Sequence, residues 1–544
     1  MSFLKNTKVF WVILVLVFSI SRLATWLYPF GSDHWFFYYI GRDIVEGGTL
    51  YITSWDHKGP LIFYFNSLLY ILFGQNLILH RIFLTVLGVL DTFLFYLLSK
   101  KLFEIKNEKL KIKNETRTLA VEIEDKKVNS WELGVENEKD NYGSGLFYAR
   151  LATVCYAFWR NLSQYTSSGN NNENLGIIFL ILAYLSFIIF FQKRNLLYLL
   201  ASGFYISFLA ILKMNFLILT LPLFLEILFL HRKNFFKIIS SGLVLILPVG
   251  VHLGLWIWYF SSRGTLKDYY IAAFGYNSVY WRAALSNSFG NLRDFIILSL
   301  PLLLPFLLVF LAQTICWFYP LKKFPENFKN FSKPDNFKQR FIYFIAGSGL
   351  LFSVLSGTFF TYYFLVVIPG FILILVLYFK NNEAGFNFKK FSSLNKGLAV
   401  LLVLCMLGAA GISTRQAYNT FRGSSSILDS QTQEIGDYLN QNTTKEDTII
   451  SYMYGPTLYI QADRKAGTRF TSGSFMLLDN KYKFGFSFNK IFIEDLEKSK
   501  SKYLVLPTDK KNSYYQNTEL VDYFKIHYKF EKSFEDFEVW RRVG

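Results

Sequence analysis

The sequence "GSDHWFFYYIGRDIVEGGTLYITSWDHKGPL", from Gly31 to Leu61, separates two long apolar segments. It is rich in aromatic residues, which are enriched where a membrane meets water. Ionisable groups held against a bilayer are costly and mark functional sites. Those of interest here are Asp33, Asp43, Glu46, Asp56, His57 and Lys58. The stretch therefore points to chemistry at the boundary between lipid and water.

The composition is that of a polytopic membrane protein. Of the 544 residues, 52% are hydrophobic and only 18% are charged, with 59 Phe and 35 Tyr. Apolar runs of about 16 to 25 residues recur, long enough to cross about 30 Å of hydrocarbon as helices. The net charge of +18 would also suit a nucleic-acid-binding protein. However, the basic residues gather in short segments between apolar runs, which is the positive-inside pattern.

The apolar runs predict about 11 transmembrane helices. Their approximate cores are residues 9–29, 77–99, 145–159, 174–191, 196–213, 215–230, 238–260, 295–319, 341–357, 363–379 and 398–414. With a cytoplasmic N-terminus, the basic segments "QKRN", "HRKNFFK" and "LKKFPENFKNFSKPDNFKQR" all lie inside. The first segment lacks a small-residue cleavage site and is interpreted as a retained helix. The end of the chain then lies outside the cytoplasm.

Two segments depart from the apolar pattern. Residues 100–144 mix acidic and basic side chains and predict a variable cytoplasmic insert, either a helical hairpin or disordered. After residue 414, "SSSILDSQTQEIGDYLNQNT" predicts a helix, "DTIISYMY" and "KYLVLP" predict strands, and "FEKSFEDFEVWRR" predicts a closing strand pair. We therefore expect a transmembrane domain over residues 1–414 and a soluble extracytoplasmic α/β domain over residues 415–544.

The first external loop, residues 29–76, predicts two short helices lying in the membrane interface. "SDHWFFYYIGRDIVEGG" has helical apolar spacing and is ended by Gly47-Gly48. "LIFYFNSLLYILFG" is apolar but too short to span the bilayer, and its aromatic residues suit the headgroup level.

Asp33 has two possible roles at the exit of the first helix. It precedes the aromatic segment and could cap its N-terminus. It could also act as a general base at the boundary between water and lipid. Both roles hold together only if the carboxylate keeps a free oxygen.

Asp56, His57 and Lys58 precede Gly59-Pro60, which fixes the start of the next helix. Lys58 is either a snorkelling cation or a phosphate ligand, since helix N-termini favour anions. Arg81 has the same two interpretations. His57 is either a proton carrier or a plain interfacial residue.

Glu173 and Lys213 form a second candidate pair on the same face. Glu173 ends "SSGNNNE", where a helix start is the structural alternative to a functional carboxylate. Lys213 stands between two apolar helices, where an ionisable group is costly and a turn is the competing explanation. Cys155, Cys316 and Cys405 lie far apart in apolar runs, so neither a disulfide framework nor metal-ligand spacing is present.

The opening loop resembles the first external loop of GT-C membrane glycosyltransferases. It is most similar to the bacterial family 39 branch, which includes protein O-mannosyltransferases and lipid A aminoarabinose transferases. Asp33, Glu46-Gly47-Gly48, Tyr51 and Trp55-Asp56-His57-Lys58 match the family pattern. "NNNE", "ILKMN" and "FTYYFLVVIPG" resemble later motifs. The chain departs from the pattern at His34, where many relatives have a second acid, and at Tyr362, where the family has His.

The resemblance implies a GT-C-like enzyme of the bacterial inner membrane. It transfers a sugar, with inversion expected, from a polyprenyl-phosphate donor to a hydroxyl on a lipid, glycan or protein acceptor. Asp33 is implied as the catalytic base and Lys58 as the first ligand of the departing phosphate. The further substrate-binding candidates are Asp56, His57, Arg81, Glu173, Lys213 and Tyr362. No cofactor is expected; a divalent metal is possible, but a monophosphate donor needs it less than a nucleotide diphosphate does.

Two other classes remain open from the sequence. A transporter or flippase for lipid or polysaccharide would also suit aromatic walls and Lys213, although the internal repeats and broken helices of transporters are not seen. A non-catalytic subunit of a surface-polysaccharide assembly complex would tolerate the loss of Asp33. A soluble domain outside the cytoplasm favours the enzyme.

Overall fold

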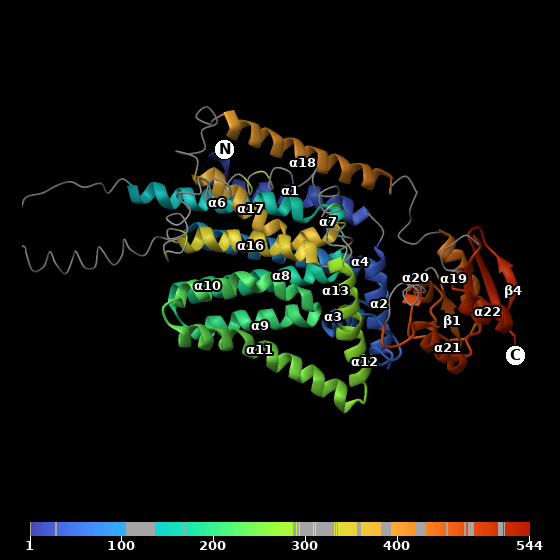
Figure 1. Cartoon of the computed structure of the whole chain (residues 1–544). Coiled ribbons are helices and arrows are strands. Elements are labelled where there is room, and N and C mark those ends of the chain that lie inside the picture. The colour runs from blue at the N-terminus through green and yellow to red at the C-terminus, as the bar shows by residue number, and fades with distance from the viewer. Residues whose placement is uncertain are drawn as a thin grey trace, which may run out of the picture.

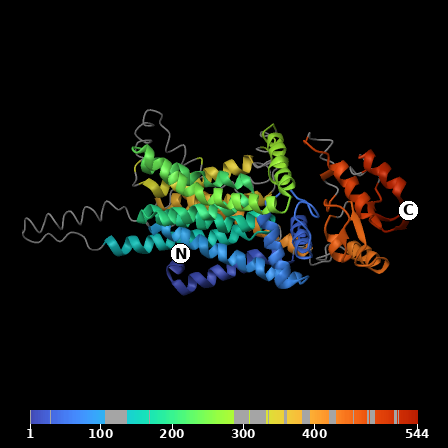
Figure 2. The same ribbon diagram turned by 90° about the horizontal axis from the view of Figure 1, so that it is seen from below.

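The computed structural model is a helical bundle with a small sheet at one end (Figures 1 and 2). It describes residues 2–27, 30–104, 137–166, 169–286, 336–355, 361–381, 393–419, 430–452, 455–472, 475–476, 484–509 and 517–543, and single positions between these ranges. The predicted insert therefore lies outside the described residues, apart from the helix ends at 100–104 and 137–144.

The bundle is built from ten described helices. They are α1 (Thr7–Leu27), α4 (Leu77–Glu104), α6 (Asn137–Arg160), α8 (Asn172–Lys193), α9 (Leu196–Leu212), α10 (Leu221–His231), α11 (Phe235–Ser262), α16 (Phe337–Leu355), α17 (Ile368–Asn381) and α18 (Ser393–Asn419). Among the described residues, four segments are long and apolar enough to cross a membrane: Leu77–Phe103, Asn172–Lys193, Met214–His231 and Phe235–Ser262. The class of helical membrane protein agrees with the prediction. The total of about 11 spans stays a prediction, and its eighth span, 295–319, is almost wholly outside the described residues.

The helices differ in how they meet their surroundings. In α8, 78% of the most apolar window is buried, whereas in α11 the share is 11%. The lipid-facing side of α11 exposes Leu247, Val251, Leu255 and Trp258. Gly203 lets α9 approach α11, because a Cβ there would lie 2.3 Å from the Leu245 carbonyl oxygen. The bundle therefore has a central helix, α8, and a peripheral helix, α11, whose free face is suited to lipid.

The two helices predicted in the first external loop are observed. They are α2 (Ser32–Val45) and α3 (Pro60–Phe73), and they pack on each other at one end of the bundle (Figure 1). Gly47 follows α2 with φ +92°, and Gly74 follows α3 with φ +55°, a left-handed conformation that other residues rarely adopt. Pro60 begins α3, where its missing N–H is not needed. At the same end α11 continues into α12 (Leu266–Tyr270), η4 (Ile271–Tyr276) and α13 (Asn277–Ser286).

The C-terminal residues form a five-stranded mixed sheet in the order β2-β1-β3-β5-β4. The strands are β1 (Thr448–Ser451), β2 (Lys465–Ala466), β3 (Tyr503–Pro507), β4 (Tyr528–Ser533) and β5 (Phe537–Arg542). The accompanying helices are α19 (Ser430–Asn442), α20 (Thr457–Gln461), α21 (Phe488–Ser499) and α22 (Thr518–His527). β1 and β3 are parallel with Ile450 beside Leu504, and β3 and β5 are antiparallel with Leu504 beside Trp540. We call residues 430–543 the sheet unit.

The elements predicted after residue 414 are present, but the predicted boundary is not settled. α18 continues through Asn419, beyond the expected limit of the membrane part. Residues 420–429 lie outside the described residues. The division at 414 and 415 therefore stays a prediction.

Candidate functional site

The loop between α2 and α3 carries Asp56, His57 and Lys58 in a fixed conformation. The Tyr51 hydroxyl donates to the Lys58 carbonyl oxygen at 2.8 Å, and the Asn277 amide donates to the His57 carbonyl oxygen at 2.7 Å. Tyr51 has φ +70°, a strained backbone that the fully buried ring must hold in place. Gly59, which follows Lys58, lies against the end of α9. A Cβ on Gly59 would be 1.7 Å from the Ile211 carbonyl oxygen. The loop is therefore tied to the bundle on both sides of its charges.

The three charged residues of this loop form one electrostatic unit. The Asp56 carboxylate lies 3.0 Å from His57 Nδ1 and 3.3 Å from Lys58 Nζ. Burial alone would raise the pKa of Asp56, but Lys58 and His57 lower it well below its ordinary value. Burial and Lys58 lower the pKa of His57, and burial of Lys58 is outweighed by Asp56 and Asp33, which raise its pKa. At neutral pH Asp56 is therefore an anion, Lys58 a cation and His57 neutral.

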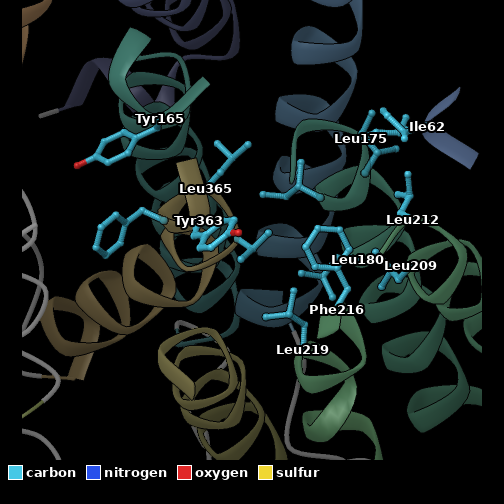
Figure 3. Close-up of a cluster of buried hydrophobic side chains, with 14 of the residues drawn as sticks. Ile62, Tyr165, Leu175, Leu180, Leu209, Leu212, Phe216, Leu219, Tyr363 and Leu365 are labelled. Atoms are coloured by element: carbon cyan, nitrogen blue, oxygen red, sulfur yellow. The ribbon is translucent and has the colours of Figure 1, made fainter. Parts of the chain in front are cut away.

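Glu173 and Lys213 form a second ion pair. Lys213 follows the last residue of α9, and its Nζ lies 3.2 Å from Glu173 Oε1 in the first turn of α8. Nζ also lies 4.0 Å from the centre of the Tyr363 ring, within the range of a cation–π contact. Figure 3 shows Tyr363 and Phe216 in the apolar cluster where α8, α9, η3 (Met214–Thr220) and η7 (Thr361–Val366) meet. The second cation is thus held by one carboxylate and one aromatic face.

Both structural alternatives for this pair are also observed. The helix α8 does begin here, but its cap is Asn171, whose side chain accepts from the Asn174 backbone N–H at 2.8 Å. Lys213 does occupy the turn into η3. The helix start and the turn therefore explain why Glu173 and Lys213 stand where they do in the chain. The ion pair between their side chains is an additional feature.

Asp33 is not the N-cap considered for it. The cap of α2 is Gly31, with no side-chain cap bond, and Asp33 lies in the first helical turn. The carboxylate is partly exposed, and among the described residues none gives it a hydrogen bond or ion pair. Its charge acts on both Lys58 and Glu173. Asp33 is therefore an uncommitted carboxylate beside the two ion pairs, and the helix N-terminus favours its negative charge.

The structure brings six of the sequence-predicted residues together. The Gly59 backbone N–H, next to Lys58, donates to the carbonyl oxygen of Leu212, next to Lys213, at 3.3 Å, so the two ion pairs adjoin. Asp33 lies close enough for its charge to act on Lys58 and Glu173. We call this set the charged cluster: Asp33, Asp56, His57, Lys58, Glu173 and Lys213.

Arg81 and Tyr362 are placed differently. Arg81 donates to the carbonyl oxygens of Thr25, at 3.2 Å, and Trp26, at the end of α1, and lies 4.3 Å from the Phe30 ring centre. Carbonyls at a helix end lack intrahelical partners, so Arg81 closes α1. Tyr362 packs on Tyr363 with ring centres 5.1 Å apart, and it is Tyr363 that contacts Lys213.

The sequence analysis did not predict a buried polar network of His34, Asn170 and Asn66 next to Asp33. His34 is fully buried and stacks on Phe30 at 3.7 Å. Its Nδ1 lies 3.1 Å from the Asn170 amide, which also donates to Asn66 at 2.7 Å. Burial, with His80 and Arg81, lowers the pKa of His34. His34 is therefore a neutral packing group. The sequence shows Asn66 and the Asn-rich segment, but nothing in it indicates that Asn66 and Asn170 form a hydrogen bond. Only the fold brings them together.

The sheet unit contacts the same loop directly. The Trp55 backbone N–H donates to the Arg469 carbonyl oxygen at 2.8 Å. The Trp55 ring lies 5.4, 5.0 and 5.4 Å from the rings of Phe470, Phe475 and Phe488. We call these the Trp55 contacts.

Two further contacts join the sheet unit to α2. Arg42 pairs with Asp463 at 2.6 Å, and the Tyr39 hydroxyl accepts from the Ala466 backbone N–H at 2.7 Å. The residue before Asp56 is therefore held by the sheet unit, and so is the helix that carries Asp33.

This arrangement suits an anionic substrate and a proton transfer. Two ammonium groups can bind a phosphate, and a carboxylate without a partner can accept a proton. Among the described residues, no group of three His, Cys, Asp or Glu side chains is arranged to hold a metal ion.

Fold and site together define a helical membrane protein whose ionisable groups converge at one end of its bundle. No family model and no curated protein sequence matches the chain. The fold is similar to that of ArnT from Cupriavidus metallidurans in a crystal structure with undecaprenyl phosphate bound. The TM-score is 0.54 with 12% sequence identity, over 98% of this chain and 98% of that chain. At this identity the likeness concerns the fold alone.

Proposed function

We propose that the protein is a membrane glycosyltransferase that takes a sugar from a polyprenyl-phosphate donor. The observation that carries the proposal is the partly exposed, uncommitted Asp33 carboxylate near Lys58 and near Glu173, the partner of Lys213. The fold supports it, because ArnT, a GT-C glycosyltransferase, has undecaprenyl phosphate bound and shares this fold along nearly the whole chain. No particular branch of that group is favoured by the fold.

The reaction is a single displacement at C1 of the sugar, with inversion. The acceptor hydroxyl oxygen forms a bond to C1 while the bond between C1 and the phosphate oxygen breaks. Asp33 accepts the hydroxyl proton, and the polyprenyl phosphate departs with the electron pair. General-base catalysis by a positioned carboxylate is typically worth about 10²- to 10⁴-fold in rate.

Lys58 and Lys213 stabilise the negative charge on the leaving phosphate. Both are held in place before the substrate arrives, Lys58 by Asp56 and Lys213 by Glu173 and Tyr363. Preorganised charge of this kind lowers the barrier because little reorganisation is needed during the reaction. His57, neutral against Asp56, fixes the carboxylate that orients Lys58. With two cations available, the proposal requires no obligatory metal.

The proposal includes the place of the site. The N-terminus and the basic segments lie in the cytoplasm, and the charged cluster and the sheet unit lie on the extracytoplasmic face of a bacterial inner membrane. The acceptor is a hydroxyl of a lipid, glycan or protein that reaches this face.

The test is transfer of labelled sugar to membrane acceptors in cells lacking the protein. Cells are complemented with wild type, Asp33→Asn or Asp522→Asn, each at equal expression. Asp522 is an exposed carboxylate of α22 that pairs with Lys525 at 3.4 Å and belongs neither to the charged cluster nor to the Trp55 contacts. We expect wild type and Asp522→Asn to restore labelled product and Asp33→Asn to lose about 10²-fold or more of the rate.

Equal restoration by Asp33→Asn would contradict an enzymatic role for this carboxylate. A non-catalytic subunit of an assembly complex would then explain the result. A transporter would be indicated instead if the purified protein moved a lipid-linked sugar across vesicles without forming any transfer product.

A further inference from the structure

A cavity of about 260 Å³ lies against the first residues of the loop between α2 and α3, apart from the charged cluster. Its wall is formed by the loop residues Gly47 to Leu50, by Tyr64 of α3, and by Tyr259, Phe260 and Arg263 at the end of α11. None of the six residues of the charged cluster lines it. The cavity is therefore a second concave site on the molecule.

The lining of this cavity carries hydrogen-bond donors and a positive charge. The Arg263 guanidinium is exposed and lies 4.8 Å from the centre of the Tyr259 ring. No carboxylate of the described residues forms an ion pair with it. The Tyr64 and Tyr259 hydroxyls are 2.7 Å apart, so one hydroxyl hydrogen joins the pair and the other is available to a ligand. A guanidinium with a nearby hydroxyl donor is the donor set that binds phosphate.

The position of the cavity indicates where that phosphate comes from. Arg263 follows the last residue of α11, the apolar helix with the most lipid-suited surface among the candidate spans. Leu255, Ile257 and Trp258 are exposed in its last turns. Exposed apolar side chains followed by Trp, Tyr and Arg mark the depth at which lipid headgroups lie. A lipid beside α11 would therefore present its headgroup at the height of Arg263.

We propose that this cavity binds the phosphate headgroup of an anionic membrane lipid, with Arg263 as the principal ligand. Phe260 lines the cavity, and its ring centre lies 5.6 Å from that of Tyr51, whose hydroxyl donates to the Lys58 carbonyl oxygen. An occupied cavity thus supports the loop conformation of the charged cluster. The binding claim does not depend on the proposed glycosyl transfer.

The experiment uses the full chain in detergent and measures binding of phosphatidylglycerol and phosphatidylcholine by native mass spectrometry. The variants are Arg263→Gln and, as control, Lys267→Gln. Lys267 is exposed on α12, four residues further along the chain, and does not line the cavity. We expect wild type and Lys267→Gln to prefer phosphatidylglycerol, and Arg263→Gln to bind it about tenfold more weakly, the usual cost of one charged hydrogen bond.

A thermal measurement supplies an independent readout. A ligand that binds only the folded protein raises its melting temperature, so phosphatidylglycerol should stabilise wild type more than Arg263→Gln. Equal binding and equal stabilisation of wild type and Arg263→Gln would overturn the proposal. So would an equal loss in both variants, which would indicate general surface charge. Inorganic phosphate that binds at Arg263 with no preference for the lipid would also overturn it.

Discussion

Asp33 and Asp56 lie near the same lysine, yet their surroundings assign them different tasks. Asp56 is buried and both of its oxygens are occupied, by His57 and Lys58. Asp33 is partly exposed and has no such partner among the described side chains. A carboxylate whose oxygens are committed positions its neighbours, whereas one with a free oxygen can accept a proton. Asp33 is therefore the stronger candidate for the base.

Variants of the pair of Glu173 and Lys213 should affect the stability of the protein and its sugar transfer differently. Replacing Lys213 with Met leaves the buried Glu173 carboxylate without its partner, which costs about 3–5 kcal/mol of stability. Adding Glu173→Gln removes the stranded charge, so the double variant should regain most of the melting temperature of wild type. It should not regain sugar transfer, because the cation proposed to bind the leaving phosphate is still missing. Thermal unfolding and transfer assays of both variants check this, and recovery of transfer in the double variant would contradict the phosphate role.

His57 predicts how stability depends on pH. The pKa of His57 is lowered in the folded protein, so the folded state binds its proton less tightly than the unfolded state, whose value is about 6.5. Above about pH 6.5 the ring is neutral in both states, and His57 does not lower the free energy of unfolding. Below that pH the unfolded state takes up a proton more readily than the folded state, so the free energy of unfolding falls. Wild type should therefore lose melting temperature below pH 6.5 more steeply than His57→Gln. Parallel curves for the two proteins would show that His57 does not titrate in this way.

The Trp55 contacts predict that a change in the sheet unit alters the loop between α2 and α3, which carries Asp56, His57 and Lys58. Phe470 and Phe524 are both 2% exposed in the sheet unit, but only Phe470 packs on Trp55. Truncation of either to Ala should cost about 3–5 kcal/mol through the cavity it leaves. Phe470→Ala should also lower kcat/KM measured well below its melting temperature, whereas Phe524→Ala should not. Equal kcat/KM values in the two folded variants would argue against positioning by the sheet unit.

Much of the element structure at this end could be predicted from local residues. Gly47, Gly74 and Pro60 act on the backbone within their own turns, so the limits of α2 and α3 follow from the sequence. The cap considered from the sequence is Asp33, but the N-cap of α2 is Gly31, which makes no side-chain cap bond and gives no signal in the sequence pattern. The Tyr363 contact with Lys213 could not be predicted, since it joins residues 150 positions apart through tertiary packing (213 and 363).

At the scale of the whole molecule, Lys58 and Lys213 supply the positive charge that a divalent metal ion would otherwise bring to the site. Lys58 and Lys213 are fixed by ion pairs within the bundle, and the pKa of Lys58 is raised by Asp56 and Asp33 in spite of its burial. Sugar transfer should therefore persist after treatment with EDTA and should not rise on addition of Mg²⁺ or Mn²⁺. Strong loss on chelation with recovery by either ion would contradict the two-lysine proposal.

The contact between Arg42 and Asp463 joins residues 421 positions apart. Trp55, which precedes Asp56, likewise donates its backbone N–H to the carbonyl oxygen of Arg469, far along the chain. During synthesis from the N-terminus, the first helices enter the bilayer long before the sheet unit exists. A nascent chain that holds Asp33, Asp56 and Lys58 therefore still lacks the contacts that fix α2 and Trp55. These contacts form only when the last hundred or so residues (roughly one small domain) have been made. Chains truncated before the sheet unit should therefore contain the charged cluster without the contacts that hold Trp55 and α2.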